Sequence, residues 1–268
     1  MDLSPQAWHQ RFELQARWTQ SLRSYLYDRT GLARAEKVLE AGCGTGALLP
    51  ELISVTTMHH PARVYGIDVD RLFLSQASEH APQARLAQAD VLALPFATGS
   101  FDASLCHFFL LWVNDPLKAI EEMRRVTRPG GPVLALAEPD YGGRIDYPQP
   151  LSQLGDWQQA SLRAQGAEPQ IGRRLAALFH GAGLQSVETG VLGGQWSRPA
   201  SSEEWKSEWE MIEWDMEKSP DPVTLPGDFR EKLDDLRALD QRARESGERV
   251  LFVPTFYAWG RVPTRMSA

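Results

Sequence analysis

The chain has 268 residues, with 28 Lys and Arg against 35 Asp and Glu, and a formal net charge of −7. Hydrophobic residues make up 43% and charged residues 24% of it, which excludes a disordered, collagen-like or coiled-coil chain. No apolar run is long enough to cross a bilayer. The start of the chain has no basic segment followed by an apolar one, so we expect no secretory signal and a cytoplasmic protein. Two cysteines make no disulfide framework, and the acidic balance disfavours nucleic acid as a partner.

The first pattern along the chain is helical. Residues 6–30 place Trp18, Leu22 and Leu26 at helical spacing, and Gly31 follows as a helix stop. We therefore predict one helix before the first strand.

Strands and helices alternate from residue 37 onward. The predicted strands cover residues 37–41, 64–68, 85–89, 104–108 and 133–137, and the predicted helices between them cover residues 47–55, 72–79 and 116–127. Such alternation demands parallel strands joined by right-handed crossovers. We predict an α/β fold with a doubly wound, Rossmann-like sheet, whose ligand site lies beyond the carboxyl ends of the strands.

The second half adds a helix and two strands, separated by an acidic segment. The helix covers residues 173–182, and the strand-like stretches cover residues 186–196 and 250–262. Residues 198–249 carry 15 acids and 9 bases, a net of −6, and contain two amphipathic helices at about 203–217 and 228–245. A solvated helical face is the simplest explanation of this charge.

We predict a single domain over residues 1–268, with a cofactor-binding core at 34–140. Residues 1–30 and the two insertions, 141–170 and 198–249, are predicted to form a helical cap over the ligand edge of the sheet.

The loop after the first strand is rich in glycine. Its sequence, Gly42-Cys43-Gly44-Thr45-Gly46-Ala47, fits both a dinucleotide-binding loop and the loop of S-adenosylmethionine enzymes, because glycine allows a tight turn and close approach to a ligand. A tight turn without a ligand is the remaining alternative. Glu40 favours the second ligand: a carboxylate repels a pyrophosphate by roughly 1–4 kcal/mol at ~4 Å, whereas it attracts an ammonium or a sulfonium.

Two further acids follow the next two strands. Asp68 is placed to accept hydrogen bonds from both ribose hydroxyls, a role that dinucleotide folds share. Asp90 is placed to accept from an adenine amino group, with Val69 and Val91 as apolar neighbours of the nucleoside. Asp90 alone would also fit a turn, so the ordered series of acids at successive strand ends is the specific signal.

With these motifs, the sequence resembles the class I S-adenosylmethionine-dependent methyltransferases. The resemblance rests on VLEAGCGTG, YGIDVD, QADVLALPFATGSFDASLCHFF and VTRPGG within residues 34–140. Within this family, the sequence resembles more specifically the small-molecule branch that includes quinone-biosynthesis enzymes (methyltransferase type 11). The resemblance implies seven strands in the order 3-2-1-4-5-7-6, one of them antiparallel, with S-adenosylmethionine as cofactor and S-adenosylhomocysteine as product. It also implies that Cys106 and His107 present backbone groups to the amino-acid end of the cofactor.

Several side chains are candidates for contact with the methyl acceptor. His107, after the fourth strand, is the predicted general base, with a structural histidine as the alternative. Glu138, Asp140 and Tyr141 follow the fifth strand, where the same string also makes a good turn. Trp209 would line an apolar or cationic substrate, or else pack the core of the cap.

The sequence thus predicts methyl transfer to a small molecule at O, N or C, by in-line displacement driven by positioning and desolvation. A nicotinamide-dependent oxidoreductase is the first alternative, which Glu40 and the absence of a Tyr-x-x-x-Lys pair oppose. A nucleic-acid methyltransferase would need an Asn/Asp-Pro-Pro-aromatic turn after the fourth strand. A non-catalytic cofactor-binding relative is the third alternative. We expect no metal site, and the sequence leaves monomer and homodimer open.

Overall fold

The computed structural model describes residues 4–57, 61–192, 205–206, 209–210, 212–214 and 229–264. The chain divides into two compact units. The first unit comprises Met1–Glu138, Arg173–Leu192 and Phe256–Ala268, and the second comprises Pro139–Gly172 and Gly193–Thr255. The two predicted insertions therefore lie in the second unit, whereas the N-terminal helical segment belongs to the first. That the second unit covers the ligand edge stays a prediction.

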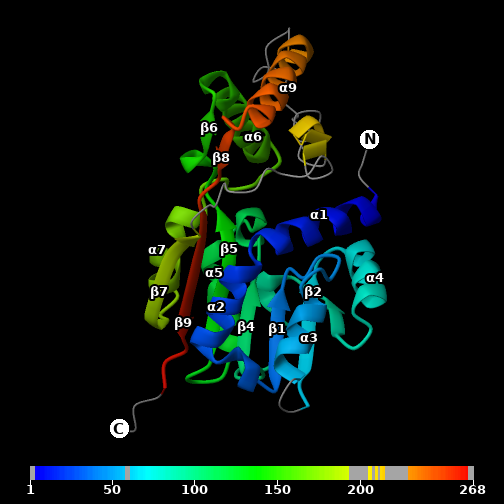
Figure 1. Cartoon of the computed structure of the whole chain (residues 1–268). Coiled ribbons are helices and arrows are strands. Elements are labelled where there is room, and N and C mark those ends of the chain that lie inside the picture. The colour runs from blue at the N-terminus through cyan, green and yellow to red at the C-terminus, as the bar shows by residue number, and fades with distance from the viewer. Residues whose placement is uncertain are drawn as a thin grey trace. The chain divides into compact units, whose positions relative to one another are not determined.

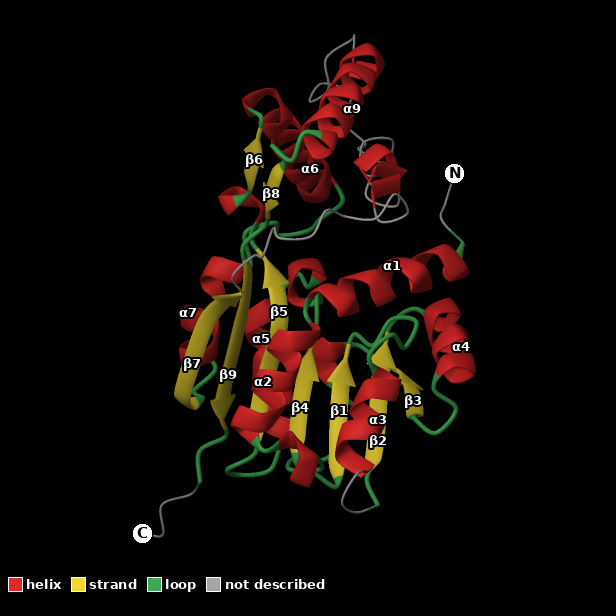
Figure 2. Cartoon of the chain, viewed as in Figure 1, coloured by secondary structure: helices red, strands yellow, loops and turns green. Residues whose placement is uncertain are grey.

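A seven-stranded sheet forms the first unit (Figures 1 and 2). Its strands are β1 (Lys37–Ala41), β2 (Arg63–Asp68), β3 (Arg85–Gln88), β4 (Ala103–Cys106), β5 (Pro132–Pro139), β7 (Gln185–Leu192) and β9 (Thr255–Arg261). They lie in the order β3-β2-β1-β4-β5-β9-β7, and β9 runs opposite to β5 in Figure 2. Since β7 and β9 are the sixth and seventh strands of this sheet, the predicted order 3-2-1-4-5-7-6 is confirmed.

Parallel pairing aligns the carboxyl ends of the inner strands in one row. β1 pairs in parallel with β2 and β4, β2 with β3, and β4 with β5. All residues of β4 and β5 are buried, as expected for inner strands covered on both faces. The crossover helices are α3 (Leu49–Thr57), α4 (Arg71–His80), α5 (Pro116–Val126) and α7 (Leu175–Gly181). Aspartate caps begin two of them: Asp70 accepts from Leu72 and Phe73 N–H, and Asp115 accepts from Lys118 N–H.

The N-terminal segment forms two helices, so the prediction of one helix over 6–30 is wrong. α1 (Pro5–Trp18) and α2 (Gln20–Thr30) are separated by Thr19, which has φ −105° and ψ 6°. The hydrophobic spacing continues across this break, so the sequence pattern does not indicate it. α2 packs Leu22 and Leu26 into the core of the sheet, and α1 extends along the end of the sheet where β1 and β2 finish (Figure 1).

The described part of the second unit includes the helices α6 and α9 and a short ribbon. β6 (Ile145–Tyr147) pairs in antiparallel fashion with β8 (Val250–Phe252), and the helices are α6 (Ser152–Ala164) and α9 (Phe229–Glu245). The predicted strand over 250–262 is therefore two strands, because the chain leaves β8 at Val253-Pro254, and proline has no N–H for a ladder. The described residues between 205 and 214 are helical, and the rest of the predicted helix 203–217 lies outside the described residues, as does the end of the predicted strand 186–196.

Short 3-10 helices occur in both units. Among the described residues they are η1 (Leu32–Arg34), η2 (Val91–Ala93), η3 (Leu110–Trp112), η4 (Tyr141–Gly143), η5 (Gln149–Leu151) and η6 (Gly172–Arg174).

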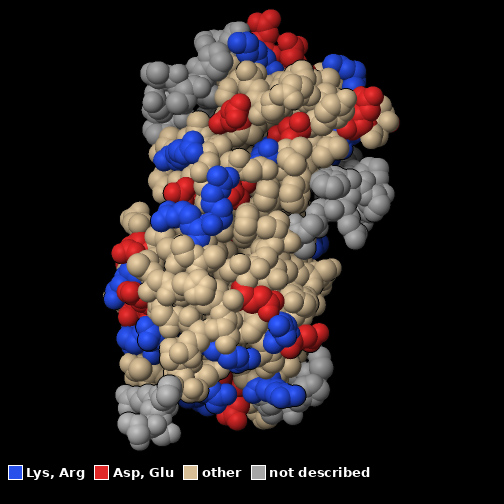
Figure 3. Space-filling model, turned by 90° about the vertical axis from the view of Figure 1, so that its left-hand side faces the viewer, with Lys and Arg blue, Asp and Glu red and all other residues tan. Residues whose placement is uncertain are grey.

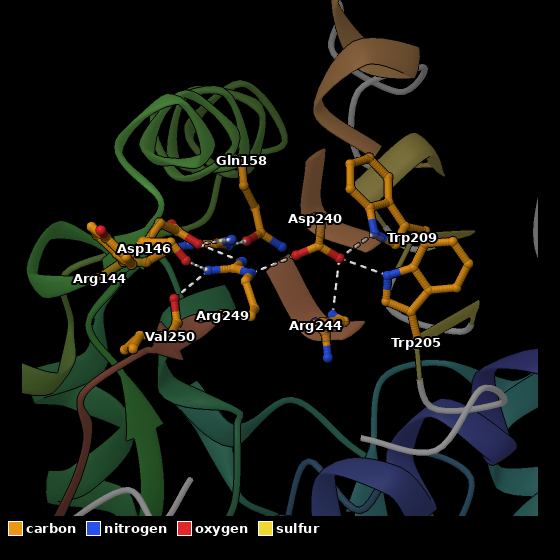
Figure 4. Close-up of polar contacts among 10 residues, drawn as sticks. Arg144, Asp146, Gln158, Trp205, Trp209, Asp240, Arg244, Arg249 and Val250 are labelled. Carbon is orange, nitrogen blue, oxygen red and sulfur yellow. Dashed lines mark hydrogen bonds and ion pairs between the residues drawn. The ribbon is translucent and has the colours of Figure 1, made fainter. Parts of the chain in front are cut away.

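A buried polar network crosses the core of the second unit (Figure 4). Asp240 on α9 accepts from the indole N–H of Trp205 (2.6 Å) and Trp209 (3.0 Å), and from Nε of Arg244 (3.0 Å) and Arg249 (2.5 Å). These donors hold the pKa of Asp240 below its ordinary value against the opposing effect of burial.

The network continues from Arg249 to the ribbon. Arg249 also bonds Asp146 of β6 (2.7 Å), and Asp146 accepts from Arg144 (2.6 Å), which in turn reaches Gln158 of α6 (2.6 Å). Ion pairs therefore join the ribbon to α9, and the hydrogen bond from Arg144 to Gln158 joins the ribbon to α6. Loss of a carboxylate from this network would leave buried positive charge without its counter-charge. No described helix has the length and apolar run needed to span a bilayer.

Candidate cofactor-binding site

The glycine loop of the first unit depends on its glycines for backbone shape and for space. Gly42, Gly44 and Gly46 have φ of 69°, 51° and 84°, a region that other residues enter at a cost. A Cβ on Gly42 would lie 2.0 Å from the ring of Phe109, and one on Gly46 would lie 3.0 Å from the backbone of Ala77. The loop is thus held between the segment after β4 and helix α4.

Glu40 lies directly before this loop, at the end of β1. Its side chain is buried, with 3% of the residue exposed, and its Oε2 has no hydrogen-bond partner among the described residues. Burial raises the pKa of Glu40 to about 8, against the opposing pull of the Arg23 guanidinium. A buried carboxyl with a free oxygen fits a cationic ligand group, because that group would replace the stabilising interactions with water that the carboxylate loses on burial.

Asp68 ties the end of β2 to the glycine loop. Its Oδ2 accepts from the Gly44 N–H and its Oδ1 from the Asp70 N–H, both at 2.9 Å. Burial raises the pKa of Asp68, and these amide donors oppose the shift. A carboxylate has about four acceptor positions, so each oxygen can still accept from a ribose hydroxyl.

Asp90 and the two valines lie at the open side of the site. Asp90 is exposed and caps the short helix η2 through a bond to the Leu92 N–H (2.9 Å). Val91 is buried, whereas 64% of Val69 is exposed directly after Asp68. The Ala89 N–H bonds the Asp68 carbonyl at 3.0 Å, so the tips of β2 and β3 are adjacent, as the sequence predicted.

The segment after β4 is shaped by a buried acid from β5. Glu138 is fully buried, and its Oε1 accepts from the backbone N–H of Phe109 and of Leu110, both at 3.0 Å. Phe108 has φ 48°, which turns the chain sharply there, so β4 ends before residue 108. Burial raises the pKa of Glu138 to about 7, and the amide donors oppose the shift. Glu138 therefore holds the segment that packs its Phe109 ring against Gly42.

The tips of three inner strands meet around Cys106. This thiol is buried and its Sγ lies 3.9 Å from Glu138 Oε1. Burial raises the pKa of Cys106, and Glu138 and Glu40 raise it further. Both carboxyls are therefore close enough to influence one thiol, which places β1, β4 and β5 at one site.

Two helices before the sheet contribute residues that the sequence analysis missed. The hydroxyl of Thr19 lies 2.8 Å from Nε2 of His107, and Arg23 forms a bidentate ion pair with Glu51 of α3 (2.8 and 2.5 Å). Arg23 is 1% exposed. The sequence shows an arginine beside Leu22 in the helical pattern, but it gives no sign of its partner Glu51, 28 residues away.

Helix α1 covers the glycine loop. The ring of Phe12 lies 3.0 Å from where a Cβ on Gly44 would be. His9 Nδ1 lies 2.9 Å from Thr45 Oγ1, and the His9 ring stacks on His80 of α4 with 3.4 Å between centroids. Burial lowers the pKa of His9, and His80 lowers it further. The loop is thus enclosed by α1 and α4 within the first unit.

The remaining candidates belong to the second unit. Asp140 is buried and donates its backbone N–H to the Pro254 carbonyl (2.8 Å), while the Tyr141 N–H bonds the Pro169 carbonyl (2.8 Å). Trp209 is 1% exposed and packs in the hydrophobic core of that unit. Its burial and its bond to Asp240 favour the core-packing alternative over a substrate wall.

Comparisons with known proteins show which family the chain resembles. Residues 39–135 match the family model described as a methyltransferase domain. The C-methyltransferase UbiE of ubiquinone/menaquinone biosynthesis from Bdellovibrio bacteriovorus is 35% identical over 123 residues, covering 44% of this chain and 49% of that protein. The malonyl-[acyl-carrier protein] O-methyltransferase of Pseudescherichia vulneris is 31% identical over 124 residues, covering 46% and 47%. The chain thus matches about half the length of these relatives.

Solved structures share the fold over more of the chain. Phosphoethanolamine N-methyltransferase 2 of Haemonchus contortus, in complex with phosphomonomethylethanolamine and S-adenosylhomocysteine, aligns with a TM-score of 0.57 at 16% identity, covering 94% of this chain and 57% of that one. The sheet order and overall fold are those of this methyltransferase structure. Residues 39–135 are thus similar to the methyltransferase domain family whose model they match.

Proposed function

We propose that the first unit binds S-adenosylmethionine and that the protein transfers its methyl group to a small-molecule acceptor. One observation carries the proposal: Glu40, Asp68 and Asp90 lie at or just after the carboxyl ends of adjacent strands around the glycine loop, and Glu40 has a buried oxygen without a partner among the described residues. Such an arrangement attracts a cationic nucleoside and repels a pyrophosphate by roughly 1–4 kcal/mol at ~4 Å.

Each residue of the site has a role in this proposal. Glu40 faces the cationic amino-acid end of the cofactor, Asp68 accepts from the ribose, and Asp90 accepts from the adenine amino group. Val69 and Val91 offer apolar contact to the ring. The backbone of Cys106 and His107 binds the amino-acid end, together with the amides of the glycine loop.

The cofactor supplies an electrophilic methyl group on its sulfonium. The protein's residues orient both partners and exclude water, and such positioning contributes on the order of 7–11 kcal/mol to lowering a barrier. In-line attack by a lone pair of the acceptor breaks the bond from methyl to sulfur, whose electron pair stays on sulfur.

The acceptor class is inferred more broadly. The names of the relatives and of the structural neighbour include a C-, an O- and an N-methyltransferase, so the atom that receives the methyl group is open in this proposal. Asp140 and Tyr141, which follow β5, are proposed to contact the acceptor. The face shown in Figure 3 mixes Lys and Arg with Asp and Glu, which supports a small molecule over a nucleic acid that would need a continuous basic surface.

Calorimetric titration tests this proposal. S-adenosylmethionine and S-adenosylhomocysteine should bind the wild-type protein with a 1:1 stoichiometry, and NAD should not. Asp68→Asn should weaken both adenosyl ligands, whereas Asp235→Asn, an exposed aspartate on α9, should change neither. Tight binding of NAD without binding of either sulfur compound would favour the oxidoreductase alternative. Binding without methyl transfer from radiolabelled cofactor to any phenol, amine or carbon acid would favour a non-catalytic relative.

A further inference from the structure

The chain turns sharply after β4, and hydrogen bonds to β5 hold this turn. Phe108 has φ 48°, a left-handed conformation that is costly for a bulky side chain. Its N–H bonds the Ala137 carbonyl at 2.8 Å. The next two amides, those of Phe109 and Leu110, both donate to Oε1 of Glu138 at 3.0 Å. A strained conformation persists where its surroundings impose it, and here β5 supplies the acceptors for all three amides.

The amides that follow Phe108 form a small concavity that suits an anion. Phe109 has φ −117° and ψ −47°, so a left-handed residue is followed by a right-handed one, and successive N–H groups in such a pair point to one side. Glu138 fills this concavity from within the chain. The residue is fully buried, and the two amide donors oppose the rise of its pKa on burial. Its carboxyl therefore serves the shape of the turn.

The side chain of Phe109 carries this shape to the glycine loop. Its backbone N–H is bound to Glu138, and its ring lies where a Cβ on Gly42 would be only 2.0 Å away. Gly42 is the first residue of the loop and has no side chain between its backbone and the ring. These residues all belong to the first unit. A change at Glu138 can therefore reach the loop through one residue.

We propose that Glu138 is a positioning residue for cofactor binding, which holds the amides of Phe109 and Leu110 so that the Phe109 ring packs on Gly42 and sets the shape of the glycine loop. This rests on the proposed function, in which that loop binds the cofactor. It replaces the contact with the methyl acceptor that the sequence predicted for Glu138. The alternative is a direct contact with a ligand through Glu138 Oε2, which is buried and has no partner among the described residues.

Calorimetric titration with S-adenosylhomocysteine tests the effect on affinity. Glu138→Leu leaves two buried amides unpaired and should weaken binding by about tenfold. Glu138→Gln keeps an oxygen for these amides and should bind nearly as tightly as the wild type. Wild-type affinity in Glu138→Leu would overturn the proposal, and so would equal losses in the two variants, because an acceptor for the amides would then make no difference.

Asp102 offers a matched control at the other end of β1. Its Oδ2 also accepts from two successive amides, those of Glu36 and Lys37, at 2.7 and 2.8 Å. Asp102→Leu should therefore lower the stability of the protein and leave the affinity for S-adenosylhomocysteine unchanged. A loss of affinity as large as that of Glu138→Leu would show a general effect of destabilisation and would overturn the positioning role.

A double-mutant cycle separates positioning from direct contact. Phe109→Leu leaves Glu138 in place and should weaken binding by about tenfold; wild-type affinity in this variant would overturn the proposal even if Glu138→Leu did not fold. Since both changes act through the same ring, the double variant should also be weaker by about tenfold. A loss of about a hundredfold would mean two independent effects and would establish the direct contact instead.

Amide NMR of the ligand-free, glycine-labelled protein tests the same link without the cofactor. The Gly42 signal should move in Glu138→Leu and in Phe109→Leu, and it should stay in place in Glu138→Gln and in Asp102→Leu. A Gly42 signal that does not move in Glu138→Leu would overturn the positioning role. If the wild type binds no adenosyl ligand in calorimetry, the proposed function fails, while this signal still shows whether Glu138 positions the loop.

Discussion

The buried carboxyl of Glu40 makes a prediction in which stability and cofactor binding change in opposite directions. Glu40→Gln removes the ionisable group and keeps its shape. The ligand-free variant should be more stable than the wild type at neutral and alkaline pH, because it no longer has to bury a charge. Its affinity for S-adenosylmethionine should fall, because the attraction to a cation is lost.

The magnitude follows from the two pKa values. The pKa of Glu40 rises from 4.5 to about 8 on burial; the difference is about 3.5 and corresponds to about 5 kcal/mol at 1.36 kcal/mol per pH unit. Since the folded state binds this proton more strongly than the unfolded state, stability falls as pH rises from 4.5 to about 8 and is level above that. About 2 kcal/mol of the cost is present at pH 6, which leaves about 3 kcal/mol to appear between pH 6 and pH 9.

Urea unfolding of both proteins at pH 6 and pH 9 gives the test. Other groups, including Glu138 with its pKa near 7, are present in both proteins and cancel in the difference of differences. The wild type should lose about 3 kcal/mol more than Glu40→Gln over this range. Equal losses in the two proteins would refute the reasoning, and so would a variant that binds the cofactor as tightly as the wild type.

Two further predictions concern space and charge. Gly42→Ala should cost ~1–2 kcal/mol of stability because of its left-handed backbone, and it should lower cofactor affinity in calorimetry by more than tenfold because the new Cβ contacts the ring of Phe109. The control is Gly31→Ala, whose Cβ has no neighbour within 4 Å at φ 75°; it should cost as much stability and leave the affinity unchanged. Equal affinities in the two variants would contradict this prediction. Asp240→Asn should destabilise the second unit by about 3–5 kcal/mol in urea unfolding, because Arg244 and Arg249 each lose one anionic partner in the core of that unit. Asp235→Asn on the same helix should have little effect, and both variants should bind the cofactor as the wild type does.

The positions of the three acids in the sheet could be predicted because their sequence signals are local. Each acid lies at or just after the carboxyl end of a short strand, and parallel strands bring these ends to one edge. Glu40, Asp68 and Asp90 are therefore placed by strand order alone, and strand order follows from the alternation of strands and helices. The bond from Gly44 to Asp68 is a consequence of that order.

Contacts between distant segments could not be predicted in this way. In the sequence, Arg23 and Thr19 are ordinary members of a helical pattern. In the structure, Arg23 pairs with Glu51 of α3, and the hydroxyl of Thr19 lies within hydrogen-bond distance of His107. Asp240 likewise lies in an acidic run whose charges suggested solvent, yet it accepts four hydrogen bonds in a core. Charge patterns along a sequence do not tell which single member of a run is buried.

The raised pKa of Glu40 also explains how the proposed cation site can be stable when no cation is bound. An ionised carboxylate that is buried and unpaired costs several kcal/mol, but a group with a pKa near 8 is mostly protonated at neutral pH and avoids much of that cost. A ligand with an ammonium or sulfonium favours the ionised form, so the charge develops where its partner has arrived. A phosphate-bearing ligand would favour the neutral carboxyl and gain no such attraction. In the proposed cofactor site, a preference for a cationic nucleoside would therefore follow from the protonation equilibrium of Glu40.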